Sequence, residues 1–465
     1  MALNRSSEPR PKELRFRRRG LMSVLLTLPL LAALFGFASQ QRGAPSFPAP
    51  PADQPVRGRI IASDGTVLAY GSASDRRYPE GTLAANLLGF TGKQQPDGRY
   101  GLEGLEYSLD KRLQNGQDVR LTIDPSLQAA AETNLKRVAE KNQAADGMAV
   151  ILEVGTGRIL AAASYPSFDP NHWRQASPQD MIDRPFAQEY EPGSVMKPFV
   201  VAGLIQDGLL SPDATVHAPM SVHVGDKTFH DVEWHPSTLS IPDVLRYSSN
   251  VGMIALTWRF TPKQLHDWLA RYGFGQPLDL NSIYSTSGLL NPWQNWVPQD
   301  QASNTIGQNV STTAVQLAAA YSILAHGGVY VPPRLVEGET LPPPHRVLSQ
   351  KVADTVFKML IHVVNASALK YSKVPGVSVA GKTGTADIYD RRLGTYPKGE
   401  YSITFAGVFP ADHPRVVTIV TLQKPQIGSK TSTWVAAPLF RAIASEVVAH
   451  WGMAPGSVAL ADSAH

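Results

Sequence analysis

The stretch Glu191-Pro-Gly-Ser-Val-Met-Lys-Pro198 decides the fold prediction, because it places a serine and a lysine three residues apart after a turn. Pro192 and Gly193 predict the turn, and the apolar run that follows predicts a buried helix. Positions three apart lie on one helix face, so the Lys197 amine is expected within reach of the Ser194 hydroxyl. The arrangement predicts a serine nucleophile activated by lysine. A helix-capping serine followed by a surface lysine is the alternative interpretation.

Two further motifs follow downstream of this serine. Ser248-Ser-Asn250 lies between two apolar helical stretches and predicts a tight loop or a helix junction. Lys382-Thr-Gly-Thr385 lies in a run that alternates like a strand, and Gly381 and Gly384 are expected to let a ligand backbone lie close. Such a strand can pair with an extended peptide while the lysine and the threonine hydroxyls meet a terminal carboxylate. Taken alone, the loop could be an ordinary turn and the strand an ordinary edge strand.

Hydrophobic periodicity along the chain predicts an α+β fold. Helix-type patterns cover 125–142 and 434–451, and strand-type patterns cover a hairpin at 148–166 and single strands at 377–387, 402–409 and 416–424. The hairpin and the three late strands are expected to form one five-stranded antiparallel sheet. The two helices can cover one face of the sheet, while the helices that carry the serine and loop motifs cover the other.

The N-terminal region predicts a membrane anchor. Residues 1–20 hold much of the positive charge of a chain whose formal net charge is +4, and an uncharged apolar run at 21–38 follows. That run is about long enough to cross a bilayer. The positive-inside rule then keeps the basic tail in the cytoplasm and exports everything after the anchor. A cleaved signal peptide is the alternative interpretation of the same run.

Composition excludes several classes of chemistry. The chain has no cysteine, which rules out a disulfide, a thiolate nucleophile and a cysteine-based metal site. Neither a Walker loop nor a dinucleotide fingerprint occurs, so no cofactor is expected. The basic tail has only Phe16 as an aromatic platform, so nucleic acid is not an expected partner. His230 and His235 resemble a pair of metal ligands. A separation of five residues does not align both rings on one helix face, so a surface loop near the active-site mouth is expected instead.

The chain divides into segments by composition and pattern. A small pedestal is expected to begin with two strands joined at an Asp64-Gly65 turn. The predicted segments are a basic tail at 1–20, the anchor at 21–38, a proline-rich stalk at 39–56, the pedestal at 57–122, a catalytic domain at 123–453 and a loose tail at 454–465. The exported residues before Gly147 are too few for both a pedestal and another enzyme domain, so no glycosyltransferase domain is expected.

The three motifs in this order resemble the S-x-x-K, S-x-N and K-T-G set of the penicillin-binding protein and serine β-lactamase superfamily. Flanking residues such as Gly101-Leu-Glu-Gly-Leu-Glu106 and Ala380-Gly-Lys-Thr-Gly-Thr-Ala386 extend the similarity to class B penicillin-binding proteins. These are membrane-anchored D,D-transpeptidases with a small pedestal before the catalytic domain. Ser248-Ser-Asn-Val-Gly252 and Phe405-Ala-Gly-Val-Phe-Pro-Ala411 are more similar to the cell-division branch than to the elongation branch.

The resemblance implies a role for each motif residue in peptidoglycan cross-linking. Ser194 would attack the bond between the two terminal D-alanines of a stem peptide, with Lys197 as the base. Burial and the nearby cation of Lys382 would lower the pKa of Lys197. Ser248 would pass the proton to the leaving amine, and Asn250 would hold Lys197. The terminal carboxylate would be bound by Lys382, Thr383, Gly384 and Thr385.

The resemblance also implies partners and a place of action. Stem peptides and β-lactams would bind at the serine, in septal wall synthesis outside the bacterial cytoplasmic membrane. A SEDS-family lipid II polymerase and other divisome membrane proteins would be partners. An elongation-type transpeptidase, a D,D-carboxypeptidase or β-lactamase, and a β-lactam sensor are the alternatives. No convincing E-x-x-x-N loop lies between Asn250 and Lys382, which weighs against a β-lactamase.

Overall fold

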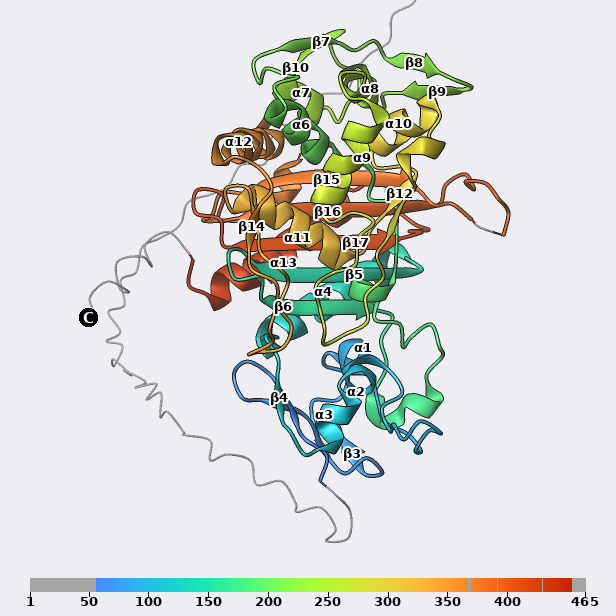
Figure 1. Ribbon diagram of the computed structural model, residues 1–465, viewed down its shortest axis with the longest axis vertical. Helices are drawn as coiled ribbons and strands as arrows, with labels where there is room; N and C mark the ends of the chain where they lie inside the picture. Colours follow the sequence, from blue (N-terminus) through green and yellow to red (C-terminus); the bar gives the residue numbers. More distant parts are fainter. Residues whose placement is uncertain (1–55, 367–368, 391, 429, 454–465) are drawn as a thin grey trace, which may run out of the picture. The chain divides into compact units, whose positions relative to one another are not determined.

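The computed structural model describes residues 56–366, 369–390, 392–428 and 430–453. Its largest sheet is antiparallel, with five strands in the order β15-β16-β17-β5-β6 (Figure 1). The strands are β5 (Asp146–Glu153), β6 (Ile159–Tyr165), β15 (Ala380–Asp387), β16 (Tyr401–Phe409) and β17 (Val416–Gln423). Because β17 pairs with β5, strands from distant parts of the sequence join in one sheet. The predicted five-stranded antiparallel sheet is therefore confirmed.

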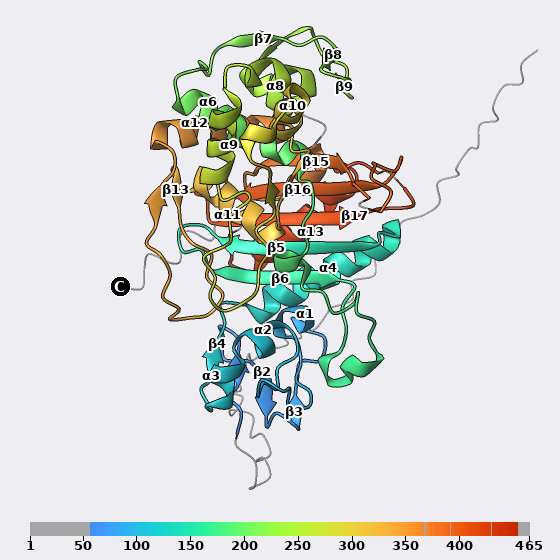
Figure 2. The same cartoon turned by 45° about the vertical axis from the view of Figure 1, so that its right-hand side comes forward.

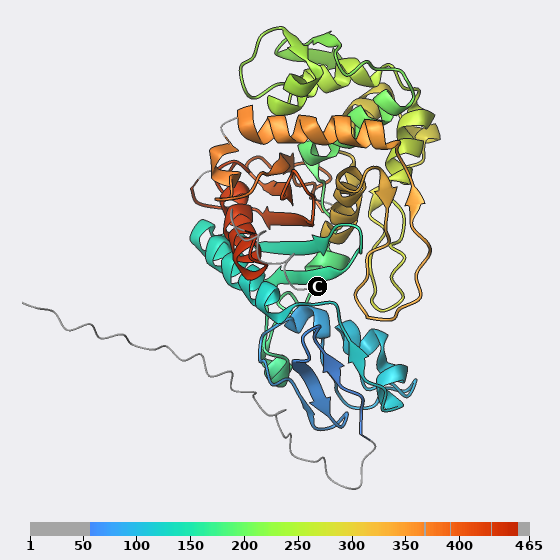
Figure 3. The same ribbon diagram turned by 90° about the vertical axis from the view of Figure 1, so that its left-hand side faces the viewer.

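One face of this sheet is covered by the two predicted helices. Helix α4 (Pro125–Asn142) and helix α13 (Ala436–His450) contact the sheet and each other (Figure 3). The start of α4 is fixed by the Asp124 carboxylate, which accepts hydrogen bonds from the backbone N–H groups of Ser126 and Leu127. The periodicity of these helices was readable because each has one apolar face toward the sheet and one polar face toward water.

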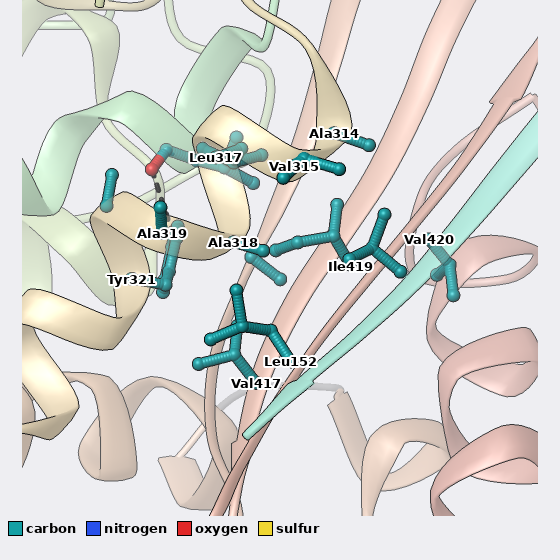
Figure 4. Close-up of a cluster of buried hydrophobic side chains, with 14 of the residues drawn as sticks. Leu152, Ala314, Val315, Leu317, Ala318, Ala319, Tyr321, Val417, Ile419 and Val420 are labelled. Carbon is teal, nitrogen blue, oxygen red and sulfur yellow. Dashed lines mark hydrogen bonds between the residues drawn. The ribbon is translucent and has the colours of Figure 1, made fainter. Parts of the chain in front are cut away.

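The other face is covered by α11 (Ala314–Ala325), which the sequence analysis did not predict. Figure 4 shows its side chains against Leu152, Val417 and Ile419 of the sheet. Residues 314–324 are all buried, so this helix has no polar face and shows no amphipathic period. The prediction that the motif helices cover this face is corrected accordingly, since α11 occupies its centre.

The serine and loop motifs lie in a helical region beside the edge strand β15. Helix α12 (Gln350–Ala366) contacts β15 and packs against two helices of this region, α6 and α7. The region contains α6 (Lys197–Gln206), α7 (Ile241–Arg246), α8 (Asn250–Thr257), α9 (Pro262–Arg271), α10 (Pro298–Thr305), β7 (Thr215–His217), β8 (Ser221–Val224), β9 (Lys227–His230) and β10 (Thr238–Ser240). Strand β7 pairs with β10, and β8 pairs with β9.

A second sheet lies near the start of the described chain, with strands in the order β3-β2-β1-β4 (Figure 2). The turn at Asp64 and Gly65 joins β1 to β2, as predicted, and Gly65 takes a left-handed φ of 98°. Arg57 and Arg76 both bind the buried carboxylate of Glu106, at 2.8 and 2.6 Å. The elements are β1 (Ile60–Ile61), β2 (Val67–Gly71), β3 (Arg76–Arg77), α1 (Ala85–Leu88), α2 (Gly104–Ser108), α3 (Asp110–Gln114) and β4 (Val119–Arg120).

Hydrogen bonds join this small sheet region to the rest of the chain. The buried Asn86 amide donates to the carbonyl oxygens of Asp180 and Ile182, at 2.6 and 3.0 Å. The Tyr78 backbone exchanges two hydrogen bonds with the Asn171 amide, at 3.1 and 2.9 Å. The described residues accordingly belong to one compact unit.

None of the helices in the described part of the chain is long and apolar enough to cross a membrane. The predicted basic tail at 1–20, the anchor at 21–38, nearly all of the stalk at 39–56 and the loose tail at 454–465 lie outside the described residues.

Candidate active site

Ser194 lies in a 3₁₀ turn, η2 (Gly193–Met196), and the α-helix begins only at Lys197. This corrects the expectation that Ser194 and Lys197 share one face of the same α-helix. Pro198 has no N–H to donate to the Ser194 carbonyl oxygen, so the Lys197 N–H bonds to that oxygen in a tighter turn. Gly193 takes a left-handed φ of 61°, which glycine adopts at little cost. The local sequence therefore forces a sharp turn directly before the helix and places the serine on it.

Lys197 is completely buried and points at the loop motif. Its Nζ donates to the Ser248 carbonyl oxygen at 2.5 Å and to Asn250 Oδ1 at 2.8 Å. The Ser248 hydroxyl lies 3.4 Å from the same amine. The Ser194 hydroxyl makes no hydrogen bond to any residue within the described ranges. Lys197 lies only three residues after Ser194 in the chain, but its amine is held by Ser248 and Asn250 of the second motif.

A second buried lysine reaches the same loop from the sheet. Lys382 Nζ donates to the Ser248 hydroxyl at 2.8 Å and to the Thr383 carbonyl oxygen at 3.0 Å. Ser248 lies at the junction of α7 and α8 with a left-handed φ of 56°, which is uncommon for serine. This backbone conformation lets both its carbonyl oxygen and its hydroxyl face lysines. The structure therefore brings one residue of each motif together around Ser248.

Burial holds both lysines toward the neutral form. It lowers the pKa of Lys197 well below the ordinary value, the charge of Lys382 lowers it further, and Asp231 opposes the shift. Burial also lowers the pKa of Lys382, to about 7, although Glu233 acts in the opposite direction. A neutral Lys197 amine can accept a proton near neutral pH.

Strand β15 is the edge strand beside the serine turn. A side chain at Gly384 would place its Cβ 2.5 Å from the Pro192 carbonyl oxygen and 3.0 Å from a methyl group of Val195. The missing side chain therefore makes room for the serine turn. At Gly381 a Cβ would meet the Phe405 ring at 2.8 Å, so that glycine serves sheet packing.

Thr385 ends the motif on an exposed position of β15. Its hydroxyl lies 2.9 Å from the hydroxyl of the buried Ser432, which in turn donates to the Gly384 carbonyl oxygen. A Cβ on Gly193 would lie 2.9 Å from the Thr385 carbonyl oxygen. The serine turn and the end of the lysine motif are therefore in direct contact.

Sequence reasoning missed three residues that hold this site. Asp231 accepts hydrogen bonds from Ser249 and from the backbone at the start of α8. Ser432 holds the end of β15, and the Tyr321 hydroxyl donates to the Val195 carbonyl oxygen at 2.9 Å. The clustering of polar residues at 230–235 was a usable signal for Asp231, whereas nothing in the sequence marks the other two.

A cavity of about 840 Å³ lies at the end of the sheet, next to the serine turn. Glu191 lines it, together with Asp387 from the end of β15 and Tyr396 from the following loop. Tyr396 donates its hydroxyl hydrogen to Glu191 at 2.9 Å, and the Asn309 backbone N–H donates at 3.0 Å. Burial raises the pKa of Glu191 despite these hydrogen bonds. None of the motif residues lines this cavity, and Glu191, three residues before Ser194, is its nearest lining residue in sequence to the serine.

Comparison with known proteins identifies the family. Residues 147–445 match the penicillin-binding protein transpeptidase domain. The chain is 34% identical over 422 residues to penicillin-binding protein PbpB of Mycolicibacterium smegmatis, covering 80% of this chain and 64% of that protein. It is 31% identical over 406 residues to the probable peptidoglycan D,D-transpeptidase PenA of Neisseria gonorrhoeae, covering 82% of this chain and 69% of that protein.

A solved structure agrees with these sequence matches. Penicillin-binding protein 3 from Mycobacterium tuberculosis in its apo form superposes with a TM-score of 0.78 at 32% identity, over 86% of this chain and 97% of that one. The same protein has also been solved in complex with ampicillin. The chain spans 64% of the length of the M. smegmatis relative. Motif geometry, domain match and structural likeness agree, and the chain belongs to the penicillin-binding protein transpeptidases, as a class B member most similar to the division branch.

Proposed function

We propose that this protein is a D,D-transpeptidase that cross-links peptidoglycan stem peptides in septal wall synthesis and is a target of β-lactams. The observation that carries the proposal is the meeting of Lys197, Ser248, Asn250 and Lys382 through contacts of 2.5 to 3.4 Å, behind a serine turn that lies against an edge strand. The names and the ampicillin complex of the relatives support the same chemistry.

In the proposed acylation step, Ser194 Oγ bonds to the carbonyl carbon between the two terminal D-alanines. Neutral Lys197 takes the serine proton, and Ser248 relays that proton from Lys197 to the leaving amine as the C–N bond breaks, which leaves Lys197 neutral again. The last D-alanine leaves and an ester on Ser194 remains. In the second step the amine of a neighbouring stem peptide attacks that ester, and its proton returns to Ser194 through Lys197. Asn250 holds Lys197 during both proton transfers.

Strand β15 is the proposed binding surface for the donor peptide. Its free edge can pair with an extended peptide, while Lys382, Thr383 and Thr385 bind the terminal carboxylate. The backbone N–H groups of Ser194 and Thr385 would hold the oxyanion, and the close contact of Gly193 with the Thr385 carbonyl supports this pairing. The donor chain would then continue along β15 toward Asp387.

The proposal extends to the part of the chain outside the described residues. Residues 21–38 would anchor the protein in the bacterial cytoplasmic membrane, with a pedestal at 57–122 and a transpeptidase domain at 123–453 outside the cytoplasm. A SEDS-family lipid II polymerase and other divisome membrane proteins are the proposed partners. The resemblance of Ser248-Ser-Asn-Val-Gly252 to the division branch supports the septal role.

Labelling with a fluorescent penicillin tests the nucleophile. Mass spectrometry is expected to place the adduct on the Ser194 peptide, and Ser194→Ala is expected to abolish labelling. Ser177→Ala, which changes an exposed serine, serves as the control and is expected to label normally. An adduct on any other peptide contradicts the assignment.

The same preparation distinguishes transfer from hydrolysis. With a thioester donor and a D-amino acid acceptor, the aminolysis product is expected to exceed the hydrolysis product, because no positioned carboxylate is proposed to activate water. Free acid as the main product at saturating acceptor would identify a carboxypeptidase or β-lactamase instead.

A further inference from the structure

The segment from His230 to His235 holds a buried carboxylate against the start of helix α8. Asp231 Oδ2 accepts hydrogen bonds from His235 Nε2 at 2.8 Å and from the Ser249 hydroxyl at 2.6 Å. Asp231 Oδ1 accepts hydrogen bonds from the backbone N–H groups of Asn250 and, at 3.1 Å, Val251. The side chains of His235 and Asp231 are 0% and 2% exposed. This carboxylate therefore lies out of water, directly behind the loop motif.

The contacts determine the charge of both side chains. The Ser249 hydroxyl and the backbone N–H groups of Asn250 and Val251 all donate to the Asp231 carboxylate, which therefore serves as an acceptor here. His235 Nδ1 faces the Pro236 carbonyl oxygen at 2.8 Å, while Nε2 faces Asp231. Both partners can only accept, so both ring nitrogens must donate and the imidazole is protonated. Burial alone would lower the pKa of His235, but the bonds to Pro236 and Asp231 outweigh it and raise the pKa.

The same segment fixes the orientation of Asn250. Its side-chain Nδ2 donates to the His230 carbonyl oxygen at 2.9 Å, and its backbone N–H donates to Asp231. With the amide nitrogen held on this side, Oδ1 points at Lys197 Nζ, 2.8 Å away. Asp231 also binds the Ser249 hydroxyl, which accepts a hydrogen bond from the Gly252 N–H at 2.8 Å.

Packing at the tip of the segment cannot provide this positioning. Val232 and Trp234 are 99% and 77% exposed, although they lie between the two buried residues of the pair. The segment is held from within by its charged pair and by the N–H groups at the start of α8, where an anion is favoured. The Tyr247 ring lies beside the His235 ring, with 5.5 Å between the ring centroids.

We propose that Asp231 and His235 form a buried ion pair that positions Ser248 and Asn250 against Lys197, and that both are positioning residues for acylation. The pair also sets part of the field at the proposed base. Lys382 from β15 and Asp231 are the charged groups that act on Lys197. Asp231 favours the protonated amine, whereas Lys382 favours the neutral amine.

Penicillin acylation rates of the full-length protein across pH test the proposal. Asp231→Asn keeps the shape of the side chain, but its amide N–H groups would face the hydroxyl and backbone N–H groups that now donate to the carboxylate. Acylation is expected to fall about a hundredfold because the loop shifts. Loss of the negative charge is also expected to move the acidic limb of the pH profile to lower pH, because the pKa of Lys197 falls. A role confined to fold stability would lower the melting temperature without moving this limb.

Variants at the histidine provide the rescue and the control. His235→Gln keeps a donor toward Asp231 and is expected to retain acylation within about tenfold of wild type, whereas His235→Phe is expected to lose as much as Asp231→Asn. His172→Gln makes the same change in the exposed pair of His172 with Asp169, 2.9 Å apart, and is expected to leave acylation unchanged. Wild-type rates and an unchanged pH profile in a folded Asp231→Asn protein would overturn the proposal.

Nitrogen NMR of the wild-type protein tests the ion pair even if a variant does not fold. At pH 7, where an exposed histidine is mostly neutral, both ring nitrogens of His235 are expected to be protonated, with the signal assigned through His235→Gln. A neutral tautomer at this pH would overturn the proposal. The positioning role rests on the proposed base function of Lys197, but the NMR result does not. Failure of Ser194 labelling with an intact imidazolium signal would therefore reject the function and leave the pair.

Discussion

At the scale of single residues, the site places two lysine amines in its interior, where a charged amine would destabilise the fold. Lys197 and Lys382 both donate hydrogen bonds to Ser248, and burial lowers the pKa of each lysine. A lysine that must be neutral to act as a base and one that must meet a carboxylate are both placed where water cannot solvate them. The chemistry therefore costs folding free energy, which the surrounding core must supply.

Lys382→Met is expected to raise the stability of the protein at neutral pH. The folded pKa of Lys382 is about 7, below its unfolded value, so stability falls as pH decreases from the unfolded pKa toward 7. Removing the amine eliminates this penalty and is expected to add roughly 1–3 kcal/mol to the unfolding free energy at pH 7, after the lost hydrogen bonds. The gain is expected to shrink toward pH 10 in thermal melts.

The exposed Lys136 provides the control for this measurement. Its side chain is 69% exposed, and Lys136→Met is expected to leave the melting temperature nearly unchanged at both pH values. A Lys382→Met protein less stable than wild type at pH 7 would show that the hydrogen bonds to Ser248 and Thr383 outweigh the burial of the amine.

At the scale of elements, the contact between η2 and β15 decides how the serine is presented. The turn lies so close to the strand that Gly384 has no room for a methyl group beside the Pro192 carbonyl oxygen. Gly384→Ala is expected to push the turn away from β15 and to slow penicillin acylation by roughly 5- to 150-fold, the rate equivalent of about 1–3 kcal/mol of strain. Stopped-flow measurement of acylation gives this rate.

Gly208→Ala separates backbone strain from crowding in that experiment. Gly208 has a left-handed φ of 70°, but a Cβ there would meet nothing within 4 Å. The substitution is expected to cost stability while acylation stays at the wild-type rate. Wild-type acylation by Gly384→Ala would contradict a tight contact between the turn and the strand.

Elements with a clear period were predictable, and elements fixed by burial or by distant partners were not. The strands at 402–409 and 416–424 and the helix at 125–142 were predicted nearly to the residue, because short runs rich in apolar and β-branched residues mark the strands and amphipathicity marks the helix. Helix α11 was missed, since a helix buried on all sides has no period to read. The 3₁₀ turn at Ser194 depends on the missing N–H of Pro198, which the sequence contained but the prediction did not use.

The candidate site likewise contains residues that the sequence motifs predicted and residues that only the fold brings together. The motif spacing predicted the meeting of a serine, two lysines and a polar loop, because each motif carries its chemistry in adjacent residues. Asp231 and Ser432 act through residues 18 and 48 positions away in sequence, and only the fold brings such partners together. The two glycines of the strand were predicted as positions of close approach, and within the protein Gly384 lies against the serine turn while Gly381 lies against the Phe405 ring.

At the scale of the whole molecule, the small sheet and the five-stranded sheet belong to one compact unit. The buried Asn86 joins them through hydrogen bonds to the carbonyl oxygens of the half-buried Asp180 and Ile182. Asn86→Ala is expected to lower the unfolding free energy by about 1–3 kcal/mol, since two half-buried carbonyl oxygens lose their donor. Because the regions share this junction, loss of helical signal and loss of penicillin binding are expected to coincide in one transition.

A second asparagine gives the comparison for this measurement. The Asn134 amide donates to the Ala130 carbonyl oxygen inside α4, at 2.9 Å, and joins no two regions. Asn134→Ala is expected to change stability by less than about 0.5 kcal/mol. Two separate transitions in the wild-type protein would show that the small sheet unfolds independently.

The stacked glycines around the serine turn bear on how drug resistance can evolve. A Cβ at Gly307 would lie 2.0 Å from the Gly193 carbonyl oxygen, and one at Gly193 would lie 2.9 Å from the Thr385 carbonyl oxygen. The atoms that these Cβ atoms would meet belong to the backbone, which cannot move aside as a flexible side chain can. Mutations that reduce antibiotic capture are therefore expected to avoid these positions and to accumulate on the exposed loops that border the cavity, where substitution leaves the nucleophile in place.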